Sequence, residues 1–135
     1  MTRRQSRETM MQILFELEVA GELDALHASA LAEEMIDNKE KERSKTLLVN
    51  ITDNMNSIDD EINAHSKSWK TSRMPKVDLA VLRLAVGEAR YADDVSDAVV
   101  VSEAINLAKK YSTEQSASFV HGVLGAVLKD GRSDE

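Results

Sequence analysis

The chain has 135 residues, of which 42% are hydrophobic and 30% are charged, and it contains no cysteine. This length suits one domain with a single core, and the lack of cysteine excludes disulfides, thiolate metal sites and a cysteine nucleophile. The formal net charge of -7 excludes a general nucleic-acid binder, because the bulk field repels phosphate, so any nucleic-acid site must be local.

Composition and hydropathy also predict the fold class and the compartment. Residues that favour tight turns or strands are scarce: the chain has five glycines, one proline and 4% aromatic residues. Good helix formers are plentiful, so the composition predicts an all-α fold. No stretch approaches the roughly 20 apolar residues that span a bilayer, and no signal peptide is visible. We therefore expect a cytoplasmic protein that makes no use of a membrane.

The first predicted helix ends at residue 20 and has one apolar stripe. Ser6 is the expected N-cap, and Gly21 is the expected glycine after the last helical residue. The stripe consists of Met10, Ile13, Leu14, Leu17 and Ala20.

Between residues 24 and 66 the sequence predicts a weak helix, a polar stretch and a long amphipathic helix. Residues 37–43 are almost wholly polar and form either a link or an exposed helical turn. The weak helix starts near Asp24 with the inner face Leu26, Ala30, Leu31 and Met35. The long helix runs towards His65 with the inner face Leu47, Leu48, Ile51, Met55, Ile58 and Ile62.

Three further helical segments are predicted in the second half. Helix is interrupted at Met74-Pro75, because the residue before a proline is pushed away from α geometry. Polar breaks at residues 93–96 and 112–116 divide the remainder into segments at 77–88, 99–111 and 119–128. The whole pattern predicts six to seven helices joined by short links.

The sequence gives no support for an enzyme, a metal site or a cofactor. His27, His65 and His121 lie far apart and match no metal-ligand spacing. No glycine-rich phosphate loop is present, and Gly122 and Gly125 fall within a helical pattern, where we expect them to permit close packing. The many carboxylates lie on polar helix faces, which are usually solvated. We expect no catalytic residues, no metal and no cofactor.

Three blocks in the second half resemble the NusB family. They are WKTSRM at 69–74 followed by KVDLAVLRLAVGE at 76–88, VSEAINLAKKYS at 101–112, and FVHGVL at 119–124. The arginine-rich segment before the first helix is also similar to that family. The resemblance implies a single all-α domain of two packed three-helix bundles, here at about residues 6–66 and 69–129.

The same resemblance implies a function and its partners. Members of the family act in transcription antitermination of ribosomal RNA and bind the boxA element jointly with the small-subunit ribosomal protein NusE. The implied partners are therefore single-stranded boxA-like RNA, NusE and the RNA polymerase antitermination complex. The helical domain also occurs fused to an RNA methyltransferase, for which a chain of 135 residues has no room.

The chain departs from the family pattern at three places. The family usually has Ile-Asn where this chain has Val101-Ser102, and asparagine where it has His121. It usually has an aromatic residue, Glu and Leu at residues 87–89, which are Gly-Glu-Ala here. These departures bear on RNA contacts and partner affinity more than on the fold.

Arg3, Arg4 and Arg7 give residues 1–7 a local charge of +3 with no acid before Glu8. They are either a solubilising tail or a phosphate-binding surface. Arginine at a helix N-terminus opposes the helix dipole, which favours a compensating anion, and the guanidinium fork suits phosphate. With the resemblance, we predict that all three contact RNA. Alanine at all three is expected to weaken RNA binding with little change in secondary structure.

Aromatic residues and one further arginine extend the predicted RNA surface. Phe15 and Phe119 are either core residues or half-exposed rings that stack on unpaired bases, and the resemblance places both near RNA. Trp69 is expected to be a core anchor between the bundles, with Arg73 either stacked on it or reaching RNA. The predicted RNA-binding set is Arg3, Arg4, Arg7, Phe15, Arg73 and Phe119.

Two acids are the predicted partner-binding residues. Asp78 and Glu88 lie on the helix that the family turns towards its protein partner, so they either contact that partner or belong to a solvated face. Arg83 is expected to form a structural pair with Glu103. The alternative function is a helical protein-interaction module without RNA binding, for which the N-terminal arginines would be dispensable.

Overall fold

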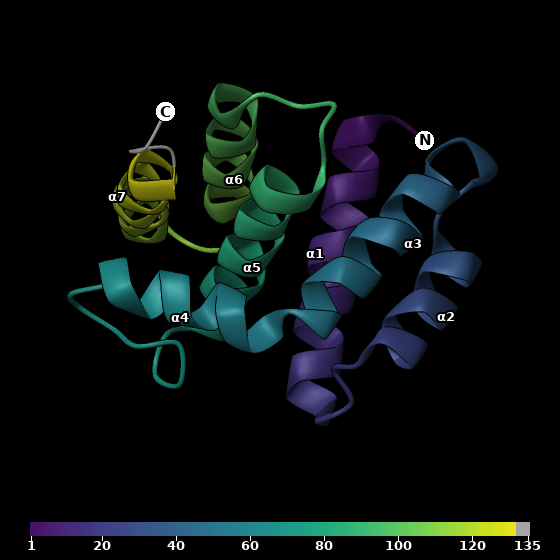
Figure 1. Ribbon diagram of the computed structural model, residues 1–135, viewed down its shortest axis with the longest axis horizontal. Helices are drawn as coiled ribbons and strands as arrows, with labels where there is room; N and C mark the ends of the chain where they lie inside the picture. The colour runs from purple at the N-terminus through teal and green to yellow at the C-terminus, as the bar shows by residue number, and fades with distance from the viewer. Residues whose placement is uncertain (132–135) are drawn as a thin grey trace.

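In a computed structural model of the chain, which describes residues 1–131, seven α-helices are present and no strand occurs among the described residues (Figure 1). The helices are α1 (Arg3–Ala20), α2 (Ala25–Met35), α3 (Asn38–Asp53), α4 (Met55–His65), α5 (Lys76–Tyr91), α6 (Asp97–Tyr111) and α7 (Glu114–Gly131). The predicted break at Met74-Pro75 is confirmed, because α5 begins directly after Pro75.

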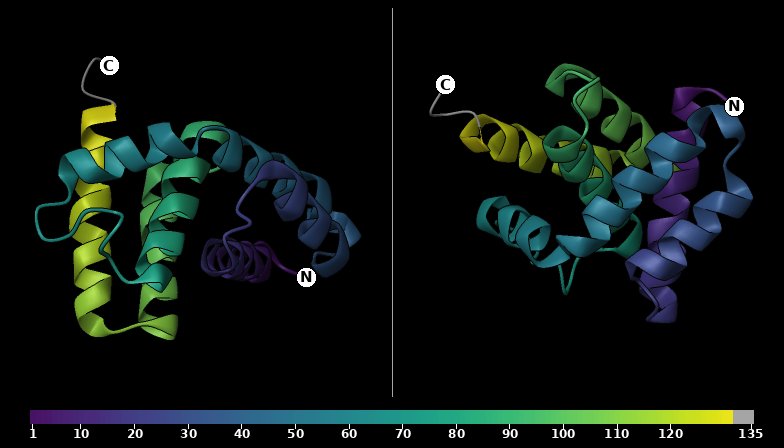
Figure 2. Two further views of the ribbon diagram at one scale, coloured as in Figure 1. Left: turned by 90° about the horizontal axis from the view of Figure 1, so that it is seen from below. Right: turned by 45° about the vertical axis from the view of Figure 1, so that its right-hand side comes forward.

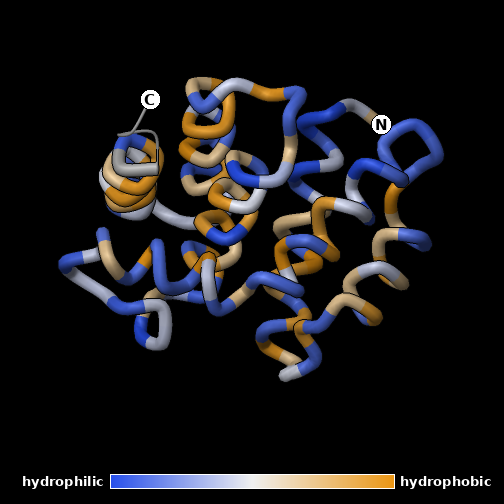
Figure 3. Tube along the Cα trace, in the orientation of Figure 1, coloured by the Kyte–Doolittle hydropathy of each residue, from blue (hydrophilic) through white to orange (hydrophobic). Residues whose placement is uncertain are grey.

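Helix α5 lies at the centre of the molecule. Every residue from Asp78 to Glu88 is buried, as expected for a helix that is covered on all sides. It packs against α1, α3, α4, α6 and α7, while α2 packs mainly on α3. The resulting apolar core is continuous, and the hydropathy colouring is mostly apolar along α7 and hydrophilic at the turn between α2 and α3 (Figure 3).

The remaining helices lie on two sides of α5. Helices α1, α2 and α3 form one side, α6 and α7 form the other, and α4 packs against α5 and α7. Seen from below, α1 is viewed end-on while α7 stands upright, so α1 crosses α7 steeply (Figure 2). The division into bundles at residues 6–66 and 69–129 stays a prediction. The packing of α4 on α5 and α7 places it with the second group of helices.

The start of α1 differs from the prediction, whereas its end is confirmed. The N-cap is Thr2, whose hydroxyl accepts the Gln5 amide, while the Gln5 side chain accepts the Thr2 amide in a capping box. Ser6 lies buried within the helix, and Gly21 ends it with a φ of 72°. The three arginines therefore belong to the first two turns of a helix rather than to a tail.

Two helices differ from the predicted pattern. The buried residues of α2 are Ala28 and Ala32, whereas Leu26 is exposed, because α2 approaches its neighbours through its small side chains. The predicted long helix is broken at Asn54, where its backbone φ of -118° and ψ of 25° leave the helical region. The polar stretch at 37–43 is largely the first turns of α3.

Glycines have different roles in α5 and α7. A Cβ added at Gly87 would lie 2.2 Å from Ile51 Cγ1, so the glycine permits the close approach of α5 to α3. A larger side chain at this position, such as the aromatic residue usual in the family, would therefore clash with Ile51 in this packing. By contrast, nothing lies within 4 Å of a Cβ added at Gly122 or Gly125, so the expectation of close packing there is wrong within this chain.

We expect Gly87→Ala to lower the free energy of unfolding by about 2 kcal/mol, because the added methyl group overpacks the contact with Ile51. Gly122→Ala is the matched control: it introduces the same methyl group into a helix where space is open, and should be neutral or stabilising. Urea unfolding of both variants measures the difference. Equal stability of the two variants would show that the α3–α5 contact relaxes without loss.

Candidate nucleic-acid interface

The N-terminal arginines belong to a chain of ion pairs in which arginines and carboxylates alternate. It connects α1, α3, α5, the α5–α6 loop and α6, with nitrogen–oxygen distances between 2.7 and 3.3 Å. Its members, in order of contact, are Glu40, Arg3, Asp94, Arg43, Glu88, Arg7, Glu103 and Arg4. Four positive and four negative charges cancel, so the prediction of an isolated positive field at the N-terminus is wrong.

Arg7 is the buried anchor of this network. It is 5% exposed, and its Nε and Nη2 donate to the Glu88 carboxylate at 2.8 to 3.0 Å. Glu88 is 2% exposed and also accepts from Arg43 at 2.9 Å. Removing Arg7 would leave a buried carboxylate with one partner fewer. The expectation that secondary structure barely changes when all three arginines are replaced stays a prediction, but the loss of Arg7 is expected to lower stability.

Arg3 and Arg4 lie nearer the solvent. Arg3 donates to Glu40 at 2.7 Å, and the 71% exposed Arg4 side chain donates to Glu103 at 3.2 Å. Burial by itself would raise the pKa of Glu40, but the hydrogen bonds from Arg3 and Ser6 outweigh it and lower that pKa. The hydrogen bond from Arg43 lowers the pKa of Asp94 to about 2. Both carboxylates are therefore ionised at neutral pH and screen the arginines.

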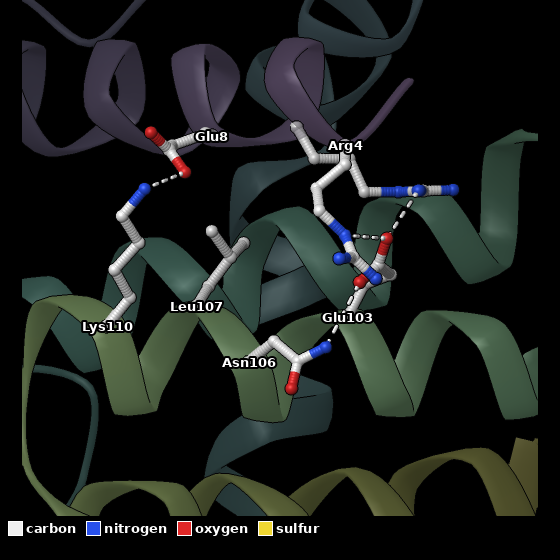
Figure 4. Close-up of a pocket in the computed structure, with 7 residues that line it drawn as sticks. Arg4, Glu8, Glu103, Asn106, Leu107 and Lys110 are labelled. Carbon is white, nitrogen blue, oxygen red and sulfur yellow. Dashed lines mark hydrogen bonds and ion pairs between the residues drawn. The ribbon is translucent and has the colours of Figure 1, made fainter. Parts of the chain in front are cut away.

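A groove of about 370 Å³ runs between α1 and α6 (Figure 4). Its lining residues are Arg4, Arg7, Glu8, Glu103, Asn106, Leu107 and Lys110. At one end Arg4 reaches down from α1 towards Glu103 on α6, and at the other end Lys110 donates to Glu8 at 2.8 Å. That hydrogen bond lowers the pKa of Glu8 and raises the pKa of Lys110. The groove thus holds three cations and one amide that could bind an anion, but each cation is paired with a carboxylate, Glu8 or Glu103, that lines the same groove.

The predicted aromatic residues lie at the surface rather than deep in the core. Phe15 and Phe119 are half-buried, and Phe119 contacts Trp69 edge-to-face with ring centroids 5.3 Å apart. Trp69 is 43% exposed, so its predicted role as a core anchor between two bundles is wrong. Arg73 is exposed and makes no recorded stacking contact with Trp69 within the described residues.

Sequence reasoning missed a second basic segment beside these rings. Residues 62–77 contain no acid, and Lys67, Lys70, Arg73 and Lys76 are all exposed. Within the part of the chain that is described, none of the four has a carboxylate partner, and Lys70 donates to the backbone carbonyls of Asn63 and Ser66. The signal was visible in the sequence as a run of cations without acids.

The predicted partner-binding acids and the predicted Arg83 pair are placed differently from expectation. Asp78 is 0% exposed and Glu88 is 2% exposed, so the solvated-face interpretation is wrong for both, and neither offers a free carboxylate to a partner. Arg83 pairs with Asp59 at 2.7 Å and with Glu18, not with Glu103, because α5 turns it towards α4 and α1.

Two departures from the family pattern meet at another surface. Ser102 and His121 line a shallow, largely apolar groove between α6 and α7.

Across residues 1–131, no helix is both long and apolar enough to cross a membrane. The described His, Asp and Glu side chains also form no group of three that could hold a metal ion.

Comparison with known proteins identifies the family. The model of the NusB family matches residues 4–129. The chain belongs to the NusB family. Among its relatives is the transcription antitermination protein NusB of Finegoldia magna, which is 36% identical over 130 residues, covering 96% of this chain and 95% of the relative.

Solved NusB structures share the fold. A T. maritima NusB structure has a TM-score of 0.86 and 34% sequence identity, covering 96% of this chain and 92% of that chain. A structure of the antitermination factors NusB and NusE in complex with double-stranded RNA has a TM-score of 0.82 and 27% sequence identity. The match covers 95% of this chain and 96% of that chain. The predicted all-α, NusB-like fold is therefore confirmed.

Proposed function

We propose that this NusB-family protein is a transcription antitermination factor that binds boxA-like single-stranded RNA together with NusE, in transcription of ribosomal RNA. It catalyses no reaction and acts in the cytoplasm, where RNA polymerase works. The observation that carries the proposal is the α1–α6 groove, which gathers Arg4, Arg7, Asn106 and Lys110 on a NusB fold. One solved relative is a complex of NusB and NusE with double-stranded RNA, which supports joint recognition of RNA and NusE.

The first end of the proposed RNA surface is the N-terminal part of α1. Arg4 is exposed enough to leave Glu103 and follow a phosphate, whereas Arg7 is fixed by Glu88 and directs its Nη1 towards the groove. Arg3 lies beside them with one face paired to Glu40. These contacts position RNA through its backbone and carry no sequence information.

The second end is the aromatic and basic surface around Phe119. Trp69 and Phe119 offer ring surface, and Phe15 on α1 is also half-exposed. Base–aromatic stacking contributes about 1–3 kcal/mol per base. The neighbouring Arg73 and Lys70 supply charge that is paired with no carboxylate within residues 1–131. We propose that bases stack here while the arginines of α1 hold the backbone.

The protein partner is proposed to dock on the side of the molecule formed by the second group of helices. Asp78 and Glu88 remain our partner-side residues, but in this structure both are buried. Any effect of Glu88 on the partner therefore acts through its ion pairs with Arg7 and Arg43, whereas both carboxylate oxygens of Asp78 are buried without a hydrogen-bond partner among the described residues. The alternative is an interaction module without RNA binding, which predicts that the wild-type chain binds no RNA with or without NusE.

Arg4→Ala tests the RNA surface without disturbing the core. We expect weaker binding of a boxA-like RNA and a salt slope, d log K/d log [salt], reduced in magnitude by about 0.7, as for one lost phosphate contact. Stability should change little, because the Arg4 side chain is exposed and Glu103 keeps its contacts with Arg7 and Asn106. Lys129→Ala, which removes one exposed cation from the end of α7, is the control. Equal RNA affinity and slope in both variants would exclude the α1 surface.

A further inference from the structure

The hydrogen bonds around Glu103 are longer than most others in the ion-pair network, where the Arg3–Asp94 contact at 3.3 Å is similarly long. Its Oε1 accepts from Arg4 Nε at 3.2 Å and from Arg7 Nη1 at 3.3 Å, and its Oε2 accepts from Asn106 Nδ2 at 3.4 Å. Bonds between a cation and a carboxylate are usually about 2.7–2.9 Å long, and those between Arg7 and Glu88 measure 2.8 to 3.0 Å. Glu103 is therefore held by several donors, each through a long contact.

The donors around Glu103 form an arrangement that suits a phosphate. They come from two helices and converge on one anion at the mouth of an open groove. Arg7 is held by Glu88 and directs Nη1 at the Glu103 carboxylate, while the more exposed Arg4 is the second donor. A phosphate accepts hydrogen bonds from several directions, as this carboxylate does. A phosphate and the Glu103 carboxylate cannot both occupy the position, because two anions at contact repel.

We propose that Glu103 is a built-in counter-anion that occupies a phosphate subsite of the α1–α6 groove and thereby sets how tightly this protein binds RNA. The inference rests on the proposed RNA-binding function. RNA enters by displacing the Glu103 carboxylate from Arg4 and Arg7, and Asn106 is released with it. In the free protein the arginines are neutralised, which limits binding to unrelated nucleic acid.

Neutralising Glu103 should therefore strengthen RNA binding. For Glu103→Gln we expect about tenfold tighter binding of a fluorescent boxA-like RNA, since one repulsive charge at contact distance is removed. The salt slope should become steeper by about 0.7, as for one additional phosphate contact. The affinity of the variant for an unrelated single-stranded RNA of equal length should rise by the same factor, because phosphate contacts carry no sequence information.

Glu61→Gln is the matched control. It removes the same charge from a carboxylate that is paired with Arg90 on the α4–α5 side, away from the groove. It should leave RNA affinity within about twofold of wild type. Glu103→Ala provides a second neutral variant in case the glutamine disturbs the packing of Arg7, and it too should bind RNA more tightly.

The outcomes separate this inference from the proposed function. Unchanged or weaker RNA binding by both Glu103 variants, with wild-type binding still dependent on Arg4, would mean that Glu103 positions the arginines, and the inference would be wrong. If Glu61→Gln and Glu103→Gln both bind RNA more tightly, the change in affinity comes from the net charge of the protein, and the inference about Glu103 would again be wrong. Absence of RNA binding by wild type with and without NusE would remove the proposed function and this inference together.

Discussion

Glu88→Ala is expected to destabilise the protein by about 3–5 kcal/mol, the range found when one partner of a buried ion pair is removed. Glu88 is 2% exposed and receives three hydrogen bonds from Arg7 and one from Arg43. Without it, the guanidinium of Arg7 stays buried with only the long contact to Glu103. Chemical unfolding monitored by circular dichroism measures the loss.

A control and a compensating variant distinguish an unpaired charge from a simple cavity. Glu61→Ala shortens the same type of side chain in a partly exposed pair with Arg90, and should destabilise by no more than about 1 kcal/mol. Replacing Arg7 with Met and Glu88 with Leu together should restore most of the stability lost in Glu88→Ala, because no unpaired charge then remains at that site. A loss of less than 1 kcal/mol in Glu88→Ala would show that water or rearrangement satisfies Arg7.

The helices could be predicted from the sequence because their signals are local. The apolar stripe of α1, the glycine at Gly21 and the proline at Pro75 each act within a few residues. The capping box at Thr2 and Gln5 was equally local and was overlooked, as was the run of cations at residues 67–76. Both signals lie within ten residues of the chain and can be identified from the sequence.

The candidate site could be predicted only in part, because its electrostatics depend on contacts between distant residues. Arg7 meets Glu88 across 81 positions and Glu103 across 96, and Arg3 meets Asp94 across 91. Local sequence patterns do not predict which carboxylate will pair with which arginine once the helices pack. The arginines were therefore identified as site residues while their neutralisation was missed. The inner face of α2 was missed for a related reason, since packing favoured Ala28 and Ala32 over its larger side chains.

The proposed function predicts that RNA and NusE strengthen each other's binding. This chain has a net charge of -7, and the arginines of α1 are already paired with carboxylates, so RNA binding by the protein alone should be weak. A basic ribosomal protein adds phosphate contacts of its own. We expect NusE to tighten RNA binding by about tenfold to hundredfold, a coupling of about 1.4–2.7 kcal/mol. Because coupling is reciprocal, RNA should tighten NusE binding by the same factor.

Joint recognition of RNA and NusE is tested most directly by a calorimetric cycle at one fixed salt concentration. It measures RNA binding with and without saturating NusE, and NusE binding with and without saturating boxA-like RNA, with NusE and RNA titrated alone to subtract their own affinity. The account predicts the same tenfold to hundredfold gain on both sides of the cycle. Equal RNA affinity in the presence and absence of NusE would mean that the two sites are independent and would contradict it.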